Sequence, residues 1–154
     1  MVKVAYFDTS ALLKKYVIET GSRWVQSYIT SRPTPQVLTS PLTLVEVSCA
    51  FARRLREGIL TAATHITIEE AFDYDIQHKY TVLNFDPMVL KVARQLARQH
   101  PLRAYDAVHL ATGCLANEQL VQAGKPPLTF VCADDRLLAI AKAEGLLVEN
   151  PNHH

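Results

Sequence analysis

Residues 2–13, VKVAYFDTSALL, decide how this chain is expected to fold. An apolar run rich in β-branched and aromatic residues meets an acid, Asp8, then two hydroxyl residues and a helical pattern. This order predicts a buried strand that ends at Asp8, followed by a helix capped by Thr9 or Ser10. In an open parallel sheet, ligands bind beyond the carboxyl ends of the strands. Asp8 therefore lies where such folds carry out chemistry.

The composition indicates a single globular domain. The chain has 154 residues, of which 49% are hydrophobic and 20% charged, and it is long enough to bury a core. Lys and Arg number 16 against 15 Asp and Glu, so the net charge of +1 neither favours nor excludes a nucleic-acid partner. We expect one domain over residues 1–150 and a tail over 151–154, whose closing histidines are native or the remnant of a purification tag.

Cysteine usage and hydropathy indicate a cytoplasmic protein. Cys49, Cys114 and Cys132 are far apart and form no CxxC motif, so we expect buried free thiols in a reducing compartment. The chain enters its first strand directly, without the pattern of a signal peptide, and no apolar run reaches the length of a membrane span.

Strand candidates alternate with helical segments along the whole chain. Further strands are expected at 37–39, 80–83, 128–132 and, at an edge, 146–148. Helices are expected over 11–17, 23–30, 42–57, 62–78, 87–99, 103–120 and 136–144. The strand runs are apolar without period-two alternation, as in sheets covered on both faces. The pattern predicts an α/β fold, a three-layer α/β/α sandwich around a mostly parallel sheet.

Four acids from distant segments are expected at one edge of that sheet. Asp8 follows the first strand, Asp134 follows the fourth, and Glu46 and Asp106 lie near the starts of helices that begin on the same edge. Clustered carboxylates stay ionised only beside positive charge, and their oxygens suit hard cations such as Mg²⁺ or Mn²⁺. Such ions activate water and stabilise charge during phosphodiester hydrolysis, so we expect a metal-dependent nuclease site.

Each acid also has a purely structural interpretation. Asp86 is expected to be a helix cap, and Asp135 is as well explained by capping as by function. Asp106 could serve the helix dipole, and His109 is more readily a packed, hydrogen-bonded histidine than a ligand. Glu46 is harder to dismiss, because it lies in a largely apolar helix between two valines.

The chain resembles the PIN domain and, more narrowly, the VapC toxins of type II toxin–antitoxin pairs. The resemblance rests on blocks that occur in the family's order across nearly the whole chain: YFDTSALLK (6–14), LVEV (44–47), YDAVHLA (105–111), ADDRLL (133–138) and AEGL (143–146). It implies an endoribonuclease that uses Mg²⁺ or Mn²⁺, is inhibited by a VapB-type antitoxin and is a homodimer.

Matching by position gives each residue a role. Asp8, Glu46, Asp106 and Asp134 match the four acids of the family's catalytic, metal-binding site. Ser10 matches a hydroxyl that orders the site through metal-bound water. Asp135 falls on a position that the family pattern leaves open.

The sequence leaves open which residues contact RNA and which of several functions the chain has. Basic side chains, for which Lys14, Arg53 and Arg136 are candidates, would position the RNA backbone. A PIN nuclease of RNA processing outside toxin–antitoxin systems, or a non-catalytic antitoxin-binding or scaffold subunit, would share these motifs. An aspartyl-phosphate enzyme is a further rival, but position 10 holds serine where haloacid-type phosphatases place a second aspartate.

Overall fold

The computed structural model describes residues 1–154 and is built on a five-stranded sheet in the order β3-β2-β1-β4-β5. The strands are β1 (Val4–Phe7), β2 (Gln36–Thr39), β3 (Tyr80–Val82), β4 (Thr129–Val131) and β5 (Leu147–Glu149). All four pairings are parallel. The expected mostly parallel sheet is thus confirmed and is in fact parallel throughout. Strand β1 lies at its centre.

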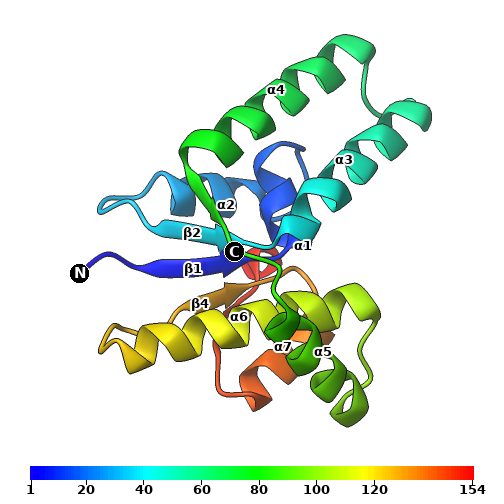
Figure 1. Ribbon diagram of the computed structural model, residues 1–154. Helices are drawn as coiled ribbons and strands as arrows, with labels where there is room; N and C mark the ends of the chain where they lie inside the picture. Colours follow the sequence, from blue (N-terminus) through cyan, green and yellow to red (C-terminus); the bar gives the residue numbers. More distant parts are fainter.

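Helices cover both faces of the sheet (Figure 1). They are α1 (Thr9–Leu12), α2 (Ser22–Ile29), α3 (Pro41–Arg56), α4 (Ala62–His78), α5 (Pro87–Gln99), α6 (Ala104–Gln122) and α7 (Asp135–Ala143), with a 3₁₀ turn at Leu13–Lys15. The predicted α/β/α architecture is confirmed. Figure 1 also shows α3 and α4 running together away from the sheet.

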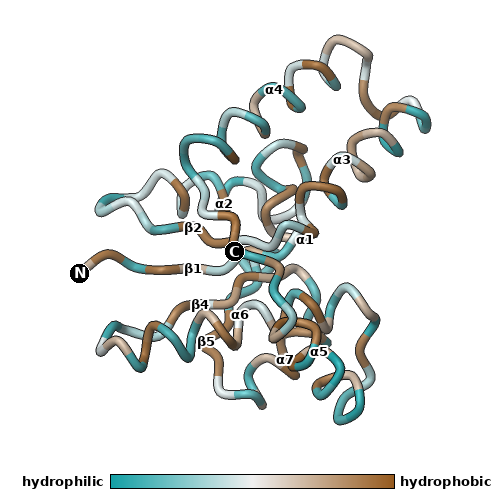
Figure 2. The backbone as a smooth tube through the Cα atoms, viewed as in Figure 1, coloured by the Kyte–Doolittle hydropathy of each residue, from teal (hydrophilic) through white to brown (hydrophobic).

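The sheet divides the core into two layers. Successive side chains of β1 point to opposite faces. Phe7 packs with Phe51 and other residues from α1 to α4, whereas Tyr6 packs with Phe130 and residues of α5 to α7. The apolar strands therefore lie between two layers of helices that contain both hydrophobic and hydrophilic residues (Figure 2).

A glycine lets α6 approach the sheet closely. A Cβ atom at Gly113 would lie 2.7 Å from a ring carbon of Phe130 on β4. Since real Cβ atoms do not approach other atoms so closely, a larger residue would push the helix outward. The close packing of α6 against the sheet matters because this helix carries Asp106 and His109.

The start of the first helix differs from the prediction. We expected a helix over 11–17 capped by Thr9 or Ser10, but α1 begins at Thr9 and gives way to the 3₁₀ turn at Leu13. The reason is that Asp8 itself is the N-cap: its Oδ1 accepts a hydrogen bond from the backbone N–H of Ala11 at 3.0 Å. The other predicted elements occur within one to three residues of their expected bounds.

Several burial expectations were wrong. Cys49 is exposed, so only Cys132 is a fully buried thiol. Val45, which supported the argument for Glu46, is 62% exposed, because α3 leans away from the sheet and buries only its other side. Lys14 is buried, where its ammonium group pairs with Glu19 and donates to the carbonyl of Thr20.

The tail over 151–154 folds onto the domain. Pro151 is buried and begins a 3₁₀ turn, while His154 stacks on Trp24 with ring centroids 4.9 Å apart. None of the seven helices combines the length and apolar character that crossing a bilayer requires.

Candidate metal centre

Asp8 is fixed at the carboxyl end of β1 by the turn that follows it. Its Oδ1 caps α1 and also accepts a hydrogen bond from Ser10 Oγ at 2.7 Å. Ser10 Oγ in turn accepts from the backbone N–H of Ala133 at 3.0 Å, in the loop between β4 and α7. The hydroxyl of Ser10 thus ties the ends of two neighbouring strands together, and Asp8 Oδ2 receives no hydrogen bond from the protein.

Asp134 follows β4 in that same loop. Its Oδ1 accepts from the backbone N–H of Arg136 at 2.9 Å and so caps α7, while the side chain is exposed. Like Asp8, Asp134 therefore uses one carboxylate oxygen for the fold and leaves the other without a protein partner.

Asp106, in the first turn of α6, has no such structural role. Its carboxylate is half-buried, accepts no hydrogen bond and forms no ion pair. Partial burial raises the pKa of this carboxyl, and the negative charges of Asp8 and Asp134 raise it further, against the weaker opposing influence of His109 and Arg103. Three aspartates from different segments thus lie within electrostatic reach of one another.

Glu46 lies to one side of this group, held by a buried hydrogen-bond chain. Its Oε1 is 2.6 Å from His109 Nε2 and accepts from Thr9 Oγ1 at 2.8 Å. Nδ1 of the same imidazole is 2.7 Å from the Tyr6 hydroxyl in the core. Burial opposes the charge on Glu46, but the bonds to His109 and Thr9 outweigh it and lower the pKa of its carboxyl. The packed interpretation of His109 is therefore confirmed.

Two residues of this chain escaped the sequence reasoning. Thr9 was considered only as a helix cap, yet its hydroxyl reaches Glu46, and Tyr6 was considered only as a strand residue. The spacing of Asp106 and His109, three residues apart on one helix, puts both on one face and would have indicated that His109 approaches the site.

The other candidate residues lie apart from the carboxylates or serve the fold. Asp135 accepts a hydrogen bond from Asn150 Nδ2 at 2.7 Å and so anchors the tail. Asp86 caps α5, as expected. Lys14, expected near the site to position RNA, is committed to its buried ion pair and is not available for that role.

The donor set fits a hard divalent cation in its chemistry. Asp106 is an ionisable group without a partner beside two further carboxylates, each with a free oxygen, and oxygen-only donors are what Mg²⁺ and Mn²⁺ prefer. However, no three acidic, histidine or cysteine side chains lie close enough to form a finished ligand set. Binding an ion here requires the carboxylates to move closer together.

Comparison with known proteins identifies the family of the chain. The family model described as the PIN domain matches residues 5–126. Ribonuclease VapC35 of Mycobacterium tuberculosis (strain CDC 1551 / Oshkosh) is 30% identical over 149 residues, covering 95% of this chain and 96% of the relative. Ribonuclease VapC49 of Mycobacterium tuberculosis (strain ATCC 25618 / H37Rv) is 32% identical over 145 residues, covering 94% of each.

Solved structures share the fold at lower identity. FitAcB from Neisseria gonorrhoeae has a TM-score of 0.64 at 20% identity and covers 98% of this chain and 99% of its own. A toxin–antitoxin complex from Klebsiella pneumoniae has a TM-score of 0.61 at 19% identity, with 96% and 97% covered. The family match over most of the chain and the full-length VapC relatives lead to one conclusion: the chain belongs to the PIN-domain family.

Proposed function

We propose that this protein is a Mg²⁺- or Mn²⁺-dependent endoribonuclease, the toxin of a type II toxin–antitoxin pair acting in the cytoplasm. The observation that carries the proposal is Asp106, a half-buried carboxylate without a partner whose pKa is raised by burial and by Asp8 and Asp134. A fold that leaves negative charges unmatched at the carboxyl edge of a parallel sheet favours a site that takes up a cation.

In this proposal the chain's residues divide the work. Asp8, Asp106 and Asp134 would hold the cation, and Glu46 would join them directly or through water. The cation supplies Lewis acidity toward water and the scissile phosphate. Ser10 would hold Asp8 and the β4–α7 loop together through its two hydrogen bonds. His109 and Thr9 would keep the carboxylate of Glu46 ionised and fixed in position.

The proposed partners are an RNA substrate, a VapB-type antitoxin and a second copy of the chain. The relatives at about 30% identity are named ribonucleases, and one protein of the same fold is described as a toxin–antitoxin complex. A short reading frame directly upstream of the gene would support the antitoxin; its absence would favour a PIN nuclease of RNA processing.

The test compares two helix-capping aspartates. Asp8 and Asp86 each accept backbone hydrogen bonds at the start of a helix, but only Asp8 is a proposed ligand of the cation. Purified parent, Asp8→Asn and Asp86→Asn proteins are incubated with structured RNAs in Mg²⁺, Mn²⁺ or EDTA. We expect the parent and Asp86→Asn to cleave with either metal, and Asp8→Asn not to.

Two results would contradict the proposal. If Asp8→Asn cleaved RNA at the parent's rate, the catalytic site could not be formed by these carboxylates. If the parent, in either metal, left intact both the structured RNAs and total RNA from the cells in which it is toxic, a non-catalytic, antitoxin-binding role would replace the enzymatic one.

A further inference from the structure

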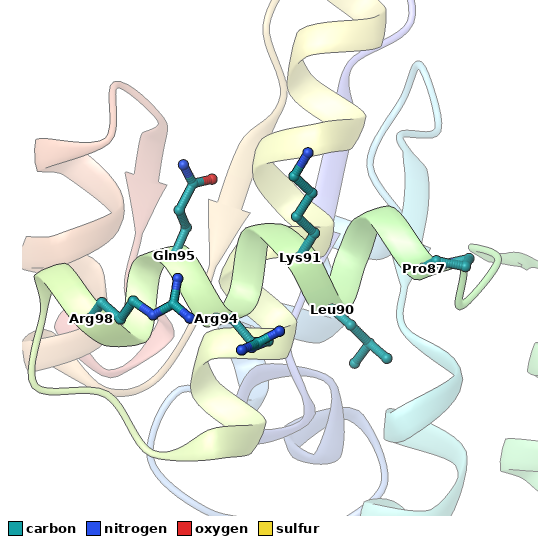
Figure 3. A pocket seen from close by; sticks show the side chains of 6 residues that line it. All are labelled: Pro87, Leu90, Lys91, Arg94, Gln95 and Arg98. Carbon is teal, nitrogen blue, oxygen red and sulfur yellow. The ribbon is translucent and has the colours of Figure 1, made fainter.

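The outer face of α5 carries a row of basic side chains. Lys91, Arg94 and Arg98 recur at helical spacing on one side of the helix, and the helix contains no acidic residue. Together with Pro87, Leu90 and Gln95 they line a shallow hollow of about 500 Å³ (Figure 3). At 1.5 Å of rise per residue, the row extends roughly 10 Å along the helix. We call these three cations the α5 basic row.

Nothing in the protein neutralises the α5 basic row. All three side chains are exposed, and none forms an ion pair or a side-chain hydrogen bond. Elsewhere the chain does match such charges: Lys14 and Arg54 pair with Glu19, and Lys79 pairs with Asp75. The row is therefore a concentration of unpaired positive charge on one helix.

The row lies on a helix that packs against α6, the helix whose first turn carries Asp106. α5 packs along α6, and the short segment between them leads from Arg98 to Arg103, which precedes the turn that carries Asp106. Arg103 donates to the Tyr105 hydroxyl; that bond, and then the charges of Asp106 and Asp134, raise the pKa of its guanidinium. Figure 1 shows α5 on the side of the molecule toward which the strands point. Arg103 therefore adds a further positive charge between α5 and the acids of the candidate centre.

We propose that the α5 basic row binds the sugar–phosphate backbone of the RNA substrate beyond the cleaved bond. This inference rests on the proposed function and extends its substrate site outward from the carboxylates. Arginine and lysine contacts to phosphates position a nucleic acid without reading its sequence. The row would therefore add affinity and hold the strand so that one phosphate reaches the centre.

The charges gathered around the hollow favour RNA over a protein partner. Of the six residues that line it, Leu90 is the one hydrophobic side chain. The core of a protein interface is usually apolar and, arginine apart, depleted of charged residues, whereas three cations gather here without an acid among the lining residues. Planar guanidinium groups, by contrast, match the geometry of phosphate oxygens and bind them bidentately.

The test removes charge from α5 and, as a control, from a distant part of the molecule. The first variant is Lys91→Gln/Arg94→Gln/Arg98→Gln; glutamine preserves the helix, since its helix propensity is close to that of lysine and arginine. The matched control is Lys3→Gln/Arg32→Gln/Lys125→Gln, which removes three exposed cations that precede β1, β2 and β4. Binding of a fluorescein-labelled single-stranded RNA is titrated in EDTA at several KCl concentrations, so that no cleavage intervenes.

The expected result is specific to the first variant. Its affinity at low salt falls by roughly tenfold or more, and its slope of log K against log [KCl] becomes shallower by about 2, the value for three lost phosphate contacts to a single strand. The control binds as the parent does. Both variants still cleave when Mn²⁺ and high concentrations of RNA are supplied, because the carboxylates are untouched.

Two outcomes overturn the inference while the proposed function stands. One is a first variant whose affinity and salt slope equal those of the parent while the parent cleaves RNA. The other is a first variant that changes oligomeric state in sedimentation, which would make the row a protein interface. A parent that neither binds nor cleaves RNA would instead refute the proposed function itself.

Discussion

Asp75 and Asp106 are both withdrawn from solvent, yet their surroundings are opposite. Asp75, near the end of α4, is buried and contacts two ammonium groups: that of Lys79 at 2.8 Å and that of Lys15. The Tyr16 hydroxyl donates to it at 2.7 Å. Burial opposes the charge of Asp75, but these bonds outweigh it and lower the pKa of its carboxyl. Asp106 has no such partner, and its pKa is raised.

The contrast shows how to tell a structural acid from a functional one in this molecule. Asp75 is neutralised by its neighbours, which is what stability alone requires of a buried charge. Asp106 forms no ion pair, and the negative charges of Asp8 and Asp134 outweigh the influence of His109 and Arg103 on it, which costs stability in the absence of another ligand. Perturbed acids without partners cluster at functional sites, so the unmatched group is the better candidate for chemistry.

The largest effect is expected from removing the unmatched charge. Asp106→Asn should lower RNA cleavage about a thousand-fold, or roughly 4 kcal/mol in the activation barrier, because a ligand of the cation is lost. In metal-free buffer the variant should melt at or above the parent's temperature, since carboxylate repulsion is relieved. Thermal melting with and without Mn²⁺ checks the second part: the ion should raise the melting temperature of the parent more than that of the variant. Equal cleavage by both proteins would contradict the assignment.

Removing the charge of Asp75, which two lysines neutralise, should lower stability and leave activity unchanged. Asp75→Asn leaves two lysines without their shared partner, one of them partly buried, and should lower the free energy of unfolding by about 3 kcal/mol. Urea titration followed by circular dichroism measures this loss. Cleavage per folded molecule should remain that of the parent, because Asp75 lies outside the site. A variant as stable as the parent would mean that the ion pairs contribute nothing net.

The stability difference between parent and Asp75→Asn should also depend on pH. The folded-state pKa of Asp75 is lowered, so its contribution is fully present above the unfolded value of about 3.9 and is lost as pH falls through the folded value. The two proteins should therefore differ most at neutral pH and approach each other in acid below about pH 4. A gap that stayed constant down to strong acid would assign the effect to packing.

The fold was largely predictable because its determinants are local. Apolar strands without alternation, the proline at the start of α3 and the Asp86–Pro87 start of α5 fix where elements begin, and parallel β/α alternation fixes the layers. The positions of Asp8 and Asp134 after strands, and of Asp106 in the first turn of a helix, followed from the same logic. What local pattern could not give was the double role of Asp8 and Asp134, which cap helices with one oxygen and leave the other free.

The failures came from side-chain contacts that the pattern of strands and helices does not reveal. Lys14 looked like an exposed cation but is buried by a partner five residues away and a carbonyl beyond it. Glu46 was singled out for its apolar neighbours, although Val45 is exposed. What holds Glu46 is His109, 63 residues along the chain, and such a pairing is decided by the packing of α3 and α6 against the sheet.

His109 allows a second comparison between acids with and without a partner. Its imidazole is the hydrogen-bond partner of Glu46, whereas Asp106 has none. His109→Ala should cost about 2 kcal/mol of stability by leaving the Tyr6 hydroxyl and Glu46 without their shared partner. His109→Gln, which can still donate a hydrogen bond, should recover part of the metal-dependent cleavage that His109→Ala loses. If both variants lose activity only in proportion to unfolded protein, measured by circular dichroism, then His109 serves packing alone.

The smallest effect is expected at Ser10, where a single hydroxyl joins an acid of the site to the neighbouring loop. Ser10→Ala removes the 2.7 Å bond to Asp8 Oδ1 and leaves the N–H of Ala133 without its acceptor, at a cost of about 1 kcal/mol. Ser31→Ala, which removes an exposed bond to the Tyr28 carbonyl, is the matched control and should be neutral. Because Asp8 keeps its cap to Ala11, the carboxylate should remain in place but less firmly held. The Mn²⁺ concentration that gives half-maximal cleavage should therefore rise several-fold while the maximal rate changes little. A fall in the maximal rate with unchanged metal dependence would instead give Ser10 a direct part in the reaction.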